Sequence, residues 1–323
     1  MGNTNFSGVT VNGAQLLPGA GFIPPFNGNY FYVNETTGSD GNPGTADAPL
    51  ASLAQAQVLA TSGNNDVVFL TGTVHQTATL AWAKNNVHLV GLCAPIKRGK
   101  RARISVSGAT PFEPLVSVTG NGCMFANFAT FYGFSTTATN NTICWQDTGG
   151  RSCYNLVEFM GFGDATVSTG TANVTGARAM VFNTNTGEST WRDCVFGVDT
   201  VARGAANYTV EIAGDAPRLH FYGCDFESDI AAGGTAGSHV LIGAAGIDRY
   251  CKFTNCVFMD ATSSGASAMA QVFNLSGSAG GFVLLNGSQL KGPTTWETAA
   301  SGSLFIDMPV VSQSGGGKML VNT

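Results

Sequence analysis

The hydrophobic positions in the second half of the chain recur with a fixed period. A short apolar phrase returns about every thirty residues, and each return is followed by a Gly-rich turn. Its copies lie at residues 179–182, 209–212, 239–242, 271–273 and 304–306. A period of roughly 20 to 50 residues is typical of stacked repeats, so each copy is predicted to be one strand of a repeating coil.

A second phrase is interleaved with the first at the same period. Its clear copies lie at residues 191–196, 221–226 and 253–258, and residues 282–285 form a looser fourth. In each clear copy a Cys and a Phe stand two positions apart, which on a strand directs both side chains to one face. Coils stacked at roughly 4.8 Å would align them in inward columns. The columns are Cys194, Cys224 and Cys256, and Phe196, Phe226 and Phe258.

Two strand registers per repeat predict an all-β solenoid, a single-stranded parallel β-helix. A leucine-rich repeat of similar period would carry the Leu-x-x-Leu-x-Leu frame, and a propeller blade would need four strands. Neither pattern is present. Residues 67–323 are therefore assigned to the β-helix.

The segment 30–66 is predicted to start the solenoid. It reads as a strand at 30–34, a loop of turn residues at 38–45 and a short capping helix from about Leu50 to Ala60. The order Tyr-Phe-Tyr-Val, then Gly-Ser-Asp-Gly-Asn-Pro-Gly-Thr, resembles the entry of the pectate-lyase-like superfamily. That resemblance implies a right-handed parallel β-helix. It does not imply one function, since enzymes, adhesins and virion proteins share the fold.

Residues 1–29 are predicted to form an extended docking arm. The segment is rich in Gly, Asn and Pro and cannot build a core alone. Its spaced apolar residues favour docking on a partner over a free tail. They are Phe6, Val9, Val11, Leu16, Leu17, Phe22, Ile23 and Phe26.

Composition narrows the class of partner. Only 11% of the 323 residues are charged and the net charge is -5, so nucleic acid is not expected as the principal partner. The N-terminus has no pattern of a secretory signal, and no apolar run is long enough to span a membrane. The eight cysteines show no metal-ligand spacing and are interpreted as buried thiols in preference to disulfides. No cofactor or metal is predicted.

One basic run stands out in this weakly charged sequence. Lys97, Arg98, Lys100, Arg101 and Arg103 are five of its fifteen basic residues. The run is interpreted either as a contact for an acidic partner protein, glycan or phosphate, or as a solvated loop.

Candidate catalytic acids gather near the second phrase. If the chain were an enzyme, Asp225, Glu227 and Asp260 would be its catalytic residues, because neighbouring coils would bring them within reach. Asp193 and Asp229 lie close by. These acids do not share one position in the repeat, so exposed side chains and turn caps are the favoured interpretation. The four histidines, His75, His88, His220 and His239, are interpreted as structural.

These observations favour an assembly protein over an enzyme. The first residues, Asn3 to Val9, are similar to the starts of proteins that decorate the heads of tailed bacteriophages. We therefore expect a capsid cement or decoration protein, made in the host cytoplasm and located in the virion. Its partner would be the major capsid protein or another virion protein, and it would form a homotrimer. One alternative is a tail fibre, spike or adhesin that binds host polysaccharide, and another is a polysaccharide lyase or hydrolase.

Overall fold

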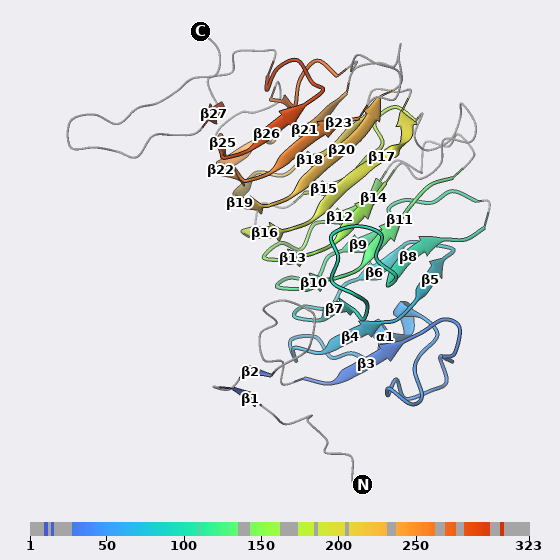
Figure 1. The fold of residues 1–323 in the computed structure, drawn as a ribbon. Coiled ribbons are helices and arrows are strands. Elements are labelled where there is room, and N and C mark those ends of the chain that lie inside the picture. The colour runs from blue at the N-terminus through green and yellow to red at the C-terminus, as the bar shows by residue number, and fades with distance from the viewer. Residues whose placement is uncertain are drawn as a thin grey trace.

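The computed structural model describes most of the chain as a stack of coils. Figure 1 shows the coils rising from the N-terminal part (blue) to the C-terminal part (red). The described residues are 10–11, 14–15, 28–108, 110–134, 143–161, 174–183, 187–203, 207–230, 237–261, 269–275, 281–297 and 304–306. Three parallel sheets of ten, eight and seven strands run along the stack.

Each regular coil adds one strand to each sheet, in the order sheet 1, sheet 2, sheet 3. Sheet 1 holds β3 (Tyr30–Val33), β4 (Val67–Leu70), β7 (His88–Gly91), β10 (Met124–Ala126), β13 (Cys153–Asn155), β16 (Ser189–Arg192), β19 (Ala216–Tyr222), β22 (Ile247–Thr254), β25 (Phe282–Asn286) and β27 (Leu304–Ile306). Sheet 2 holds β5 (Thr73–Gln76), β8 (Arg103–Val106), β11 (Ala129–Phe131), β14 (Glu158–Met160), β17 (Val195–Arg203), β20 (Asp225–Ile230), β23 (Val257–Asp260) and β26 (Gln289–Lys291). Sheet 3 holds β6 (Leu80–Trp82), β9 (Val116–Val118), β12 (Ile143–Asp147), β15 (Arg178–Phe182), β18 (Tyr208–Ile212), β21 (Ser238–Ile242) and β24 (Phe273–Asn274). The predicted all-β parallel β-helix is confirmed.

The predicted phenylalanine column exists inside the coil. Phe196 pairs in register with Phe226, which pairs with Phe258. Their stacked ring centroids lie 4.9 and 4.6 Å apart. The column also extends one coil toward the N-terminus, where Phe159 stacks on Phe196 at 5.1 Å. These rings are buried on the inner face of sheet 2. The residues next to them along each strand point to the outer face, as strand geometry requires.

The cysteines are buried or half-buried thiols, and all eight are free. Cys194, Cys224 and Cys256 follow one another from coil to coil, as predicted. Burial, together with the neighbouring Cys194 and Cys256 thiols, raises the pKa of Cys224 well above its ordinary value. This column is therefore a stack of neutral side chains that fill space.

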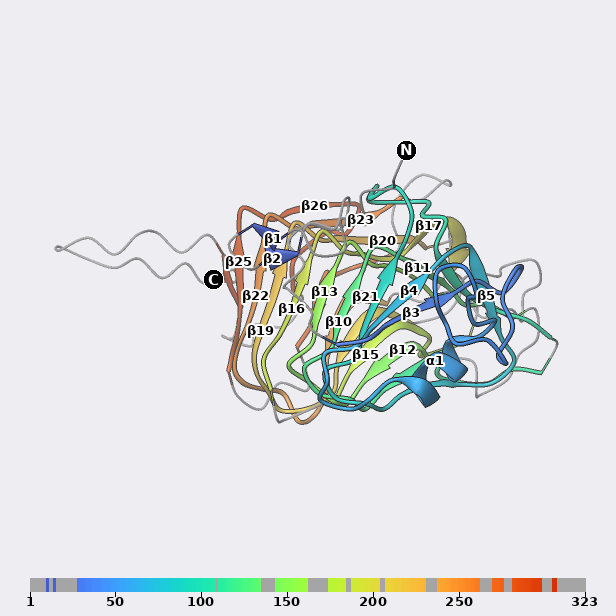
Figure 2. The same ribbon diagram turned by 90° about the horizontal axis from the view of Figure 1, so that it is seen from below.

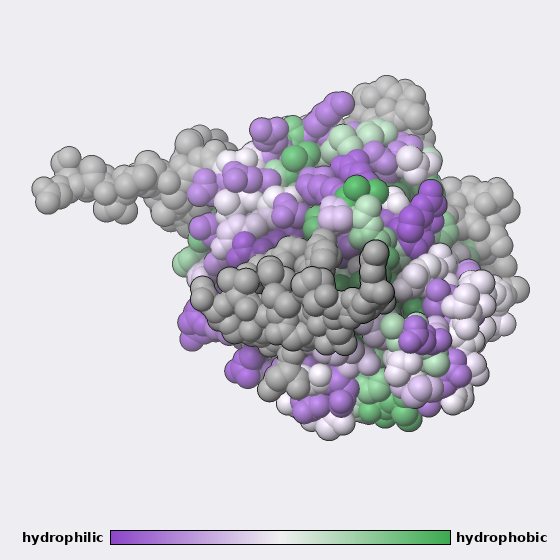
Figure 3. All heavy atoms as spheres, turned by 60° about the horizontal axis from the view of Figure 1, so that its bottom comes forward, coloured by the Kyte–Doolittle hydropathy of each residue, from purple (hydrophilic) through white to green (hydrophobic). Residues whose placement is uncertain are grey.

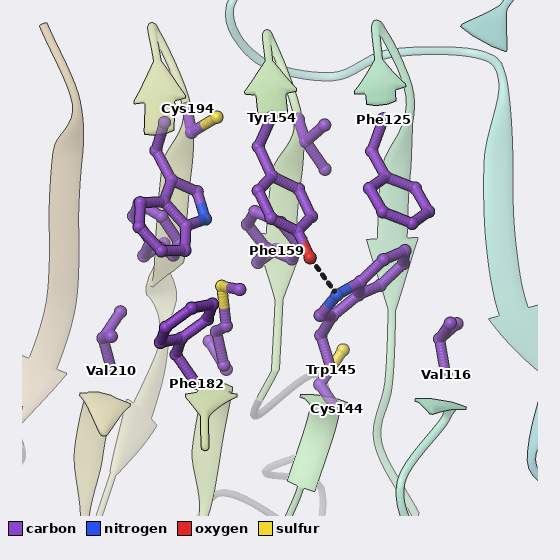
Figure 4. Packing of buried hydrophobic residues seen from close by; sticks show 14 of the residues in the cluster. Val116, Phe125, Cys144, Trp145, Tyr154, Phe159, Phe182, Cys194 and Val210 are labelled. Carbon is purple, nitrogen blue, oxygen red and sulfur yellow. Dashed lines mark hydrogen bonds between the residues drawn. The ribbon is translucent and has the colours of Figure 1, made fainter. Parts of the chain in front are cut away.

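The middle coils are packed with larger aromatic residues. Figure 4 shows Phe125, Trp145, Tyr154 and Phe159 converging inside the coil. The Trp145 Nε1–H donates to the Tyr154 hydroxyl at 3.1 Å, and that hydroxyl donates to the Asp147 carboxyl at 2.7 Å. The polar groups of Trp145, Tyr154 and Asp147 thus satisfy one another, so these aromatics can be buried in the core.

The predicted capping helix is present and begins three residues later than expected. It is α1 (Leu53–Leu59), which lies beside the first coils in Figure 2. Ser52 is its N-cap and accepts the Gln55 N–H at 3.1 Å. The Asp40 carboxylate in turn accepts the Ser52 hydroxyl at 2.8 Å, so the Gly-Ser-Asp loop fixes where the helix starts. Leu50 is bridged to Val33 and packs in the core.

A left-handed residue separates sheet 1 from sheet 2 in successive coils. Its φ is 50° at Asp193, 60° at Gly223 and 52° at Asn255. The amide of Asp193 donates to the Tyr222 carbonyl of the next coil at 2.8 Å. In the same way, the amide of Gly223 donates to the Thr254 carbonyl at 2.9 Å. Asp193, one of the acids considered above, is therefore a turn residue.

Most of the predicted docking arm lies outside the described residues. This applies to Phe6, Val9, Leu16, Leu17, Phe22, Ile23 and Phe26. Val11 belongs to β1 (Thr10–Val11), which pairs antiparallel with β2 (Ala14–Gln15). No helix in the described part of the chain is long and apolar enough to cross a membrane.

Candidate functional site

The predicted basic run and two of the predicted acids contact each other. Residues 93–102, which we call the basic loop, connect β7 to β8 and lie on the outer face of sheet 2. The Lys97 ammonium is 2.7 Å from Asp225 Oδ1 and donates to the Gly223 carbonyl at 2.7 Å. An Arg98 guanidinium nitrogen is 3.0 Å from Asp225 Oδ2. The acidic surface that meets these two cations is thus part of the same chain.

Arg98 also joins neighbouring acids on this face. It forms an ion pair with Glu227 and lies 3.9 Å from Asp199 Oδ2. Asp225 and Glu227 are two positions apart on β20 and therefore point the same way. They are only 9% and 3% exposed. A substrate would reach either carboxylate only after the basic loop had moved.

The rest of the basic run holds the loop in place. The Lys100 ammonium is buried and donates to the Lys97 carbonyl at 2.7 Å, and Arg103 Nε donates to the Lys100 carbonyl at 2.6 Å. The Gly99 amide donates to a Glu158 carboxylate oxygen at 2.9 Å. Burial lowers the pKa of Lys100, while Glu158 acts in the opposite direction. Arg101 is exposed.

Asp260, the third predicted catalytic acid, faces the interior. It pairs in register with Ser228, one residue beyond Glu227, so the two point to the other face of sheet 2. Asp260 Oδ1 accepts the Ser228 hydroxyl and the Ile230 amide, both at 2.9 Å. Asp260 also lies near the fully buried Arg203. Burial lowers the pKa of Arg203 to about 10, while the negative charges of Asp260 and Asp229 act in the opposite direction. The structure therefore separates Asp260 from Asp225 and Glu227.

A different polar group lies on the outer face of sheet 1. His220 on β19 is held between two tyrosines, with its Nδ1 2.6 Å from the Tyr222 hydroxyl and its Nε2 3.0 Å from the Tyr250 hydroxyl. All three side chains are half-buried and thus partly open to solvent. Inward residues such as Phe221 alternate with them along the strand. We call Tyr222, His220 and Tyr250 the tyrosine–histidine group.

Cations surround the tyrosine–histidine group. The Arg192 guanidinium lies over the Tyr222 ring at 4.7 Å from its centroid, and Lys252 pairs in register with His220. Arg218, opposite Tyr250, forms an ion pair with Glu188. Among the described residues, Arg192 and Lys252 make no ion pair.

Burial and the surrounding positive charge both favour the neutral form of the His220 imidazole. Burial first, and then the positive charges of Lys252 and Arg192, lower the pKa of His220. A neutral imidazole has one N–H donor and one acceptor nitrogen. It can therefore pass a proton between its two tyrosine partners.

The sequence held a signal for this group. Counting back from the Phe226 and Phe258 markers, His220 and Lys252 occupy the same repeat position, and so do Arg218 and Tyr250. Treating the histidines one at a time concealed this, because a lone histidine within a strand reads as structural. Among the described residues, no three His, Cys, Asp or Glu side chains are arranged to hold a metal ion.

Comparison with known proteins adds the fold class. No protein-family model and no curated protein matches the chain. A solved pectin methylesterase in complex with a hexasaccharide is similar, with 13% identity, a TM-score of 0.54 and coverage of 90% of this chain and 92% of that one. The deglycosylated pectin methylesterase of Aspergillus niger matches with 13% identity and a TM-score of 0.50, over 86% of this chain and 91% of that one. The fold is a parallel β-helix similar to that of these pectin methylesterases.

These matches correct one prediction. The sequence predicts that the chain is not an enzyme, because a β-helix without an evident catalytic cluster fits an assembly component. Solved proteins that share this fold along nearly all of their length are enzymes. At this level of identity the likeness shows the fold alone, so the activity has to be argued from the residues.

Proposed function

We propose that the chain acts on an acidic polysaccharide at the outer face of sheet 1. The observation that carries this proposal is the tyrosine–histidine group flanked by Arg192 and Lys252. Tyrosine rings offer flat apolar faces with a polar edge, which suits sugar rings and their hydroxyls. Arginine and lysine pair with carboxylates. The group thus combines sugar-contacting surface, positive charge and a proton-transfer residue.

The solenoid also suits a polymer. Strands β16, β19 and β22 present the same outward positions once per coil, as the pairs Thr190 with His220 and His220 with Lys252 show. A chain of similar sugars can follow such a repeat across several coils. The net charge of -5 does not oppose this, because charges beyond about 10 Å are largely screened at 0.1 M salt.

The outer face of sheet 2 is a weaker candidate. Lys97 and Arg98 already pair with the carboxylates there, and the basic loop covers them. Sugar carboxylates would compete with Asp225 and Glu227 for the same cations. The fold likeness to pectin methylesterases supports action on a polysaccharide but does not choose between the two faces.

The proposal is tested by binding. We expect the full chain to bind at least one of polygalacturonate, alginate or hyaluronate at least tenfold more tightly than the same polymer after reduction of its carboxyl groups. The double variant R192S/K252S should lose most of this preference, whereas Arg101→Ser, which removes a charge from the basic loop, should keep it. Equal affinity for a polymer and its carboxyl-reduced form, or an unchanged preference in the double variant, contradicts the proposal.

The virion role remains a prediction without structural support. No contact within the described residues supports binding to the major capsid protein, a homotrimer or a location in the virion. The fold and the tyrosine–histidine group favour the polysaccharide alternatives instead. A tail fibre or spike that acts on host polysaccharide would use the same surface.

A further inference from the structure

We propose that the tyrosine–histidine group catalyses β-elimination of a uronate-containing polysaccharide, with Tyr222 as the base and Tyr250 as the acid. This inference rests on the proposed function and specifies its chemistry. It follows from three hydrogen-bonded groups in a row, Tyr222, His220 and Tyr250, on a surface open to a polymer.

The direction of proton transfer follows from the neighbours. The Arg192 guanidinium lies over the Tyr222 ring and stabilises negative charge on that phenol. Within the described part of the chain, no cation lies over the Tyr250 ring. Tyr222 is thus the phenol that gives its proton to His220 Nδ1. The Nε2–H of the imidazole then donates to the Tyr250 oxygen, which leaves the Tyr250 O–H free to donate to substrate.

The reaction balances without any other reactant. The Tyr222 oxygen removes the proton from the sugar carbon next to the carboxylate, and the C–H electron pair becomes a carbon–carbon double bond. The bond from the neighbouring carbon to the glycosidic oxygen breaks, and its electron pair stays on that oxygen. Tyr250 gives this oxygen its proton and receives the Nε2 proton of His220. His220 keeps the Tyr222 proton on Nδ1 and ends as the other neutral tautomer.

The cations supply the electrostatic part of the reaction. Removing a proton next to a carboxylate builds negative charge onto that carboxylate. Lys252, which pairs with His220 in register, lies beside the place where this charge forms. A preorganised positive group at such a point lowers the barrier. Elimination needs neither a water nucleophile nor a pair of free carboxylates, so the paired state of Asp225 and Glu227 does not hinder it.

The experiment measures product and binding on the same proteins. The full chain is incubated with polygalacturonate, alginate and hyaluronate, and unsaturated ends are detected by the ultraviolet absorbance of the conjugated double bond and by mass spectrometry. We expect unsaturated product from at least one polymer that binds. Tyr222→Phe, Tyr250→Phe and His220→Gln should each lower the rate about 100-fold or more and change affinity less than about threefold. Tyr208→Phe, on the outer face of sheet 3, is the matched control and should keep the rate.

The outcomes separate the two proposals. Binding of a polymer by the unaltered chain without unsaturated product overturns the elimination and leaves the proposed function standing. Absence of binding to all three polymers overturns the proposed function. Unsaturated product that survives both Tyr222→Phe and Tyr250→Phe overturns the assignment of base and acid.

Discussion

Arg98 contacts Asp225 across 127 positions of sequence, with a guanidinium nitrogen 3.0 Å from Asp225 Oδ2. The basic loop that carries Arg98 leaves sheet 1 after β7, whereas Asp225 opens β20 several coils further along. The contact therefore spans β11, β14 and β17 on the outer face of sheet 2. It ties distant coils together, which neighbour-to-neighbour stacking in a solenoid does not do.

Removing this tie should destabilise the fold. Arg98→Ala leaves the largely buried Asp225 and Glu227 with one fewer donor, and we expect a loss of about 1–3 kcal/mol in the free energy of unfolding. Urea unfolding at neutral pH measures it. Arg101→Ala, in the same loop but exposed, should change the free energy by less than about 0.5 kcal/mol. Equal effects of the two substitutions would show that the ion pairs contribute no stability.

The turn between sheets 1 and 2 needs a residue that tolerates a left-handed backbone, and position 223 should tolerate alanine poorly. Its φ is +60°, and a Cβ there would lie 2.6 Å from Asp193 Oδ1 of the preceding coil. We expect Gly223→Ala to cost about 2 kcal/mol, from the left-handed strain together with displacement of the Asp193 carboxylate at the free end of its side chain. Gly63→Ala is the control, since Gly63 has φ +82° but open space around its Cβ. It should cost only about 1 kcal/mol, and a Gly223 variant no worse than this would contradict the close approach.

The phenylalanine column should dominate core stability. Phe226 stacks between Phe196 and Phe258 and is fully buried, so Phe226→Ala should cost about 3–5 kcal/mol. Phe131 lies in the same sheet but is 37% exposed on the opposite face. Phe131→Ala should cost less than about 1 kcal/mol in the same denaturation experiment. The prediction fails if the two variants unfold at the same urea concentration.

Stability should fall in mild acid because of His88. This residue on β7 accepts the Met124 amide through Nδ1 at 3.0 Å. Burial lowers its pKa from 6.5 to about 4, although the charge of Asp66 acts the other way. Above pH 6.5 folded and unfolded chains both hold the imidazole neutral. Between pH 6.5 and 4 only the unfolded chain takes up the proton, so stability is lost as the pH falls, by about 3 kcal/mol in total.

A difference measurement isolates this residue from other titrating groups. The free energy of unfolding of the unaltered chain and of His88→Asn is compared at pH 7 and pH 4.5. We expect the unaltered chain to lose more stability than the variant over this interval. The same loss in both proteins would show that His88 does not titrate as described.

The sequence predicted the coil interior better than its outer faces. Each inward side chain, such as Cys194 or Phe196, stacks on its counterpart in the next coil. The inward residues therefore repeat with the period of the coil, and the sequence shows that period directly. The pairing of Arg98 with Asp225 follows from where a loop folds back. No local period encodes that path. Asp260 was grouped with Asp225 by distance along the repeat, whereas one residue of offset placed it on the opposite face.

The tyrosine–histidine group has a signature in the sequence that no single histidine reveals. His220 and Lys252 share a repeat position, and the same alignment places Tyr222 opposite Arg192. The outward positions form this pattern only when they are compared between coils, in the register that the inward columns set. The partners of the two imidazole nitrogens could not be predicted, because tyrosine side-chain directions depend on packing between strands.

The most direct test is a structure of the chain with a bound uronate trisaccharide from the polymer that binds most tightly. We predict that the sugars lie on the outer face of sheet 1 over Tyr222, His220 and Tyr250, with a carboxylate against Lys252 or Arg192. A trisaccharide bound instead on sheet 3, or under the basic loop beside Asp225 and Glu227, would contradict the account.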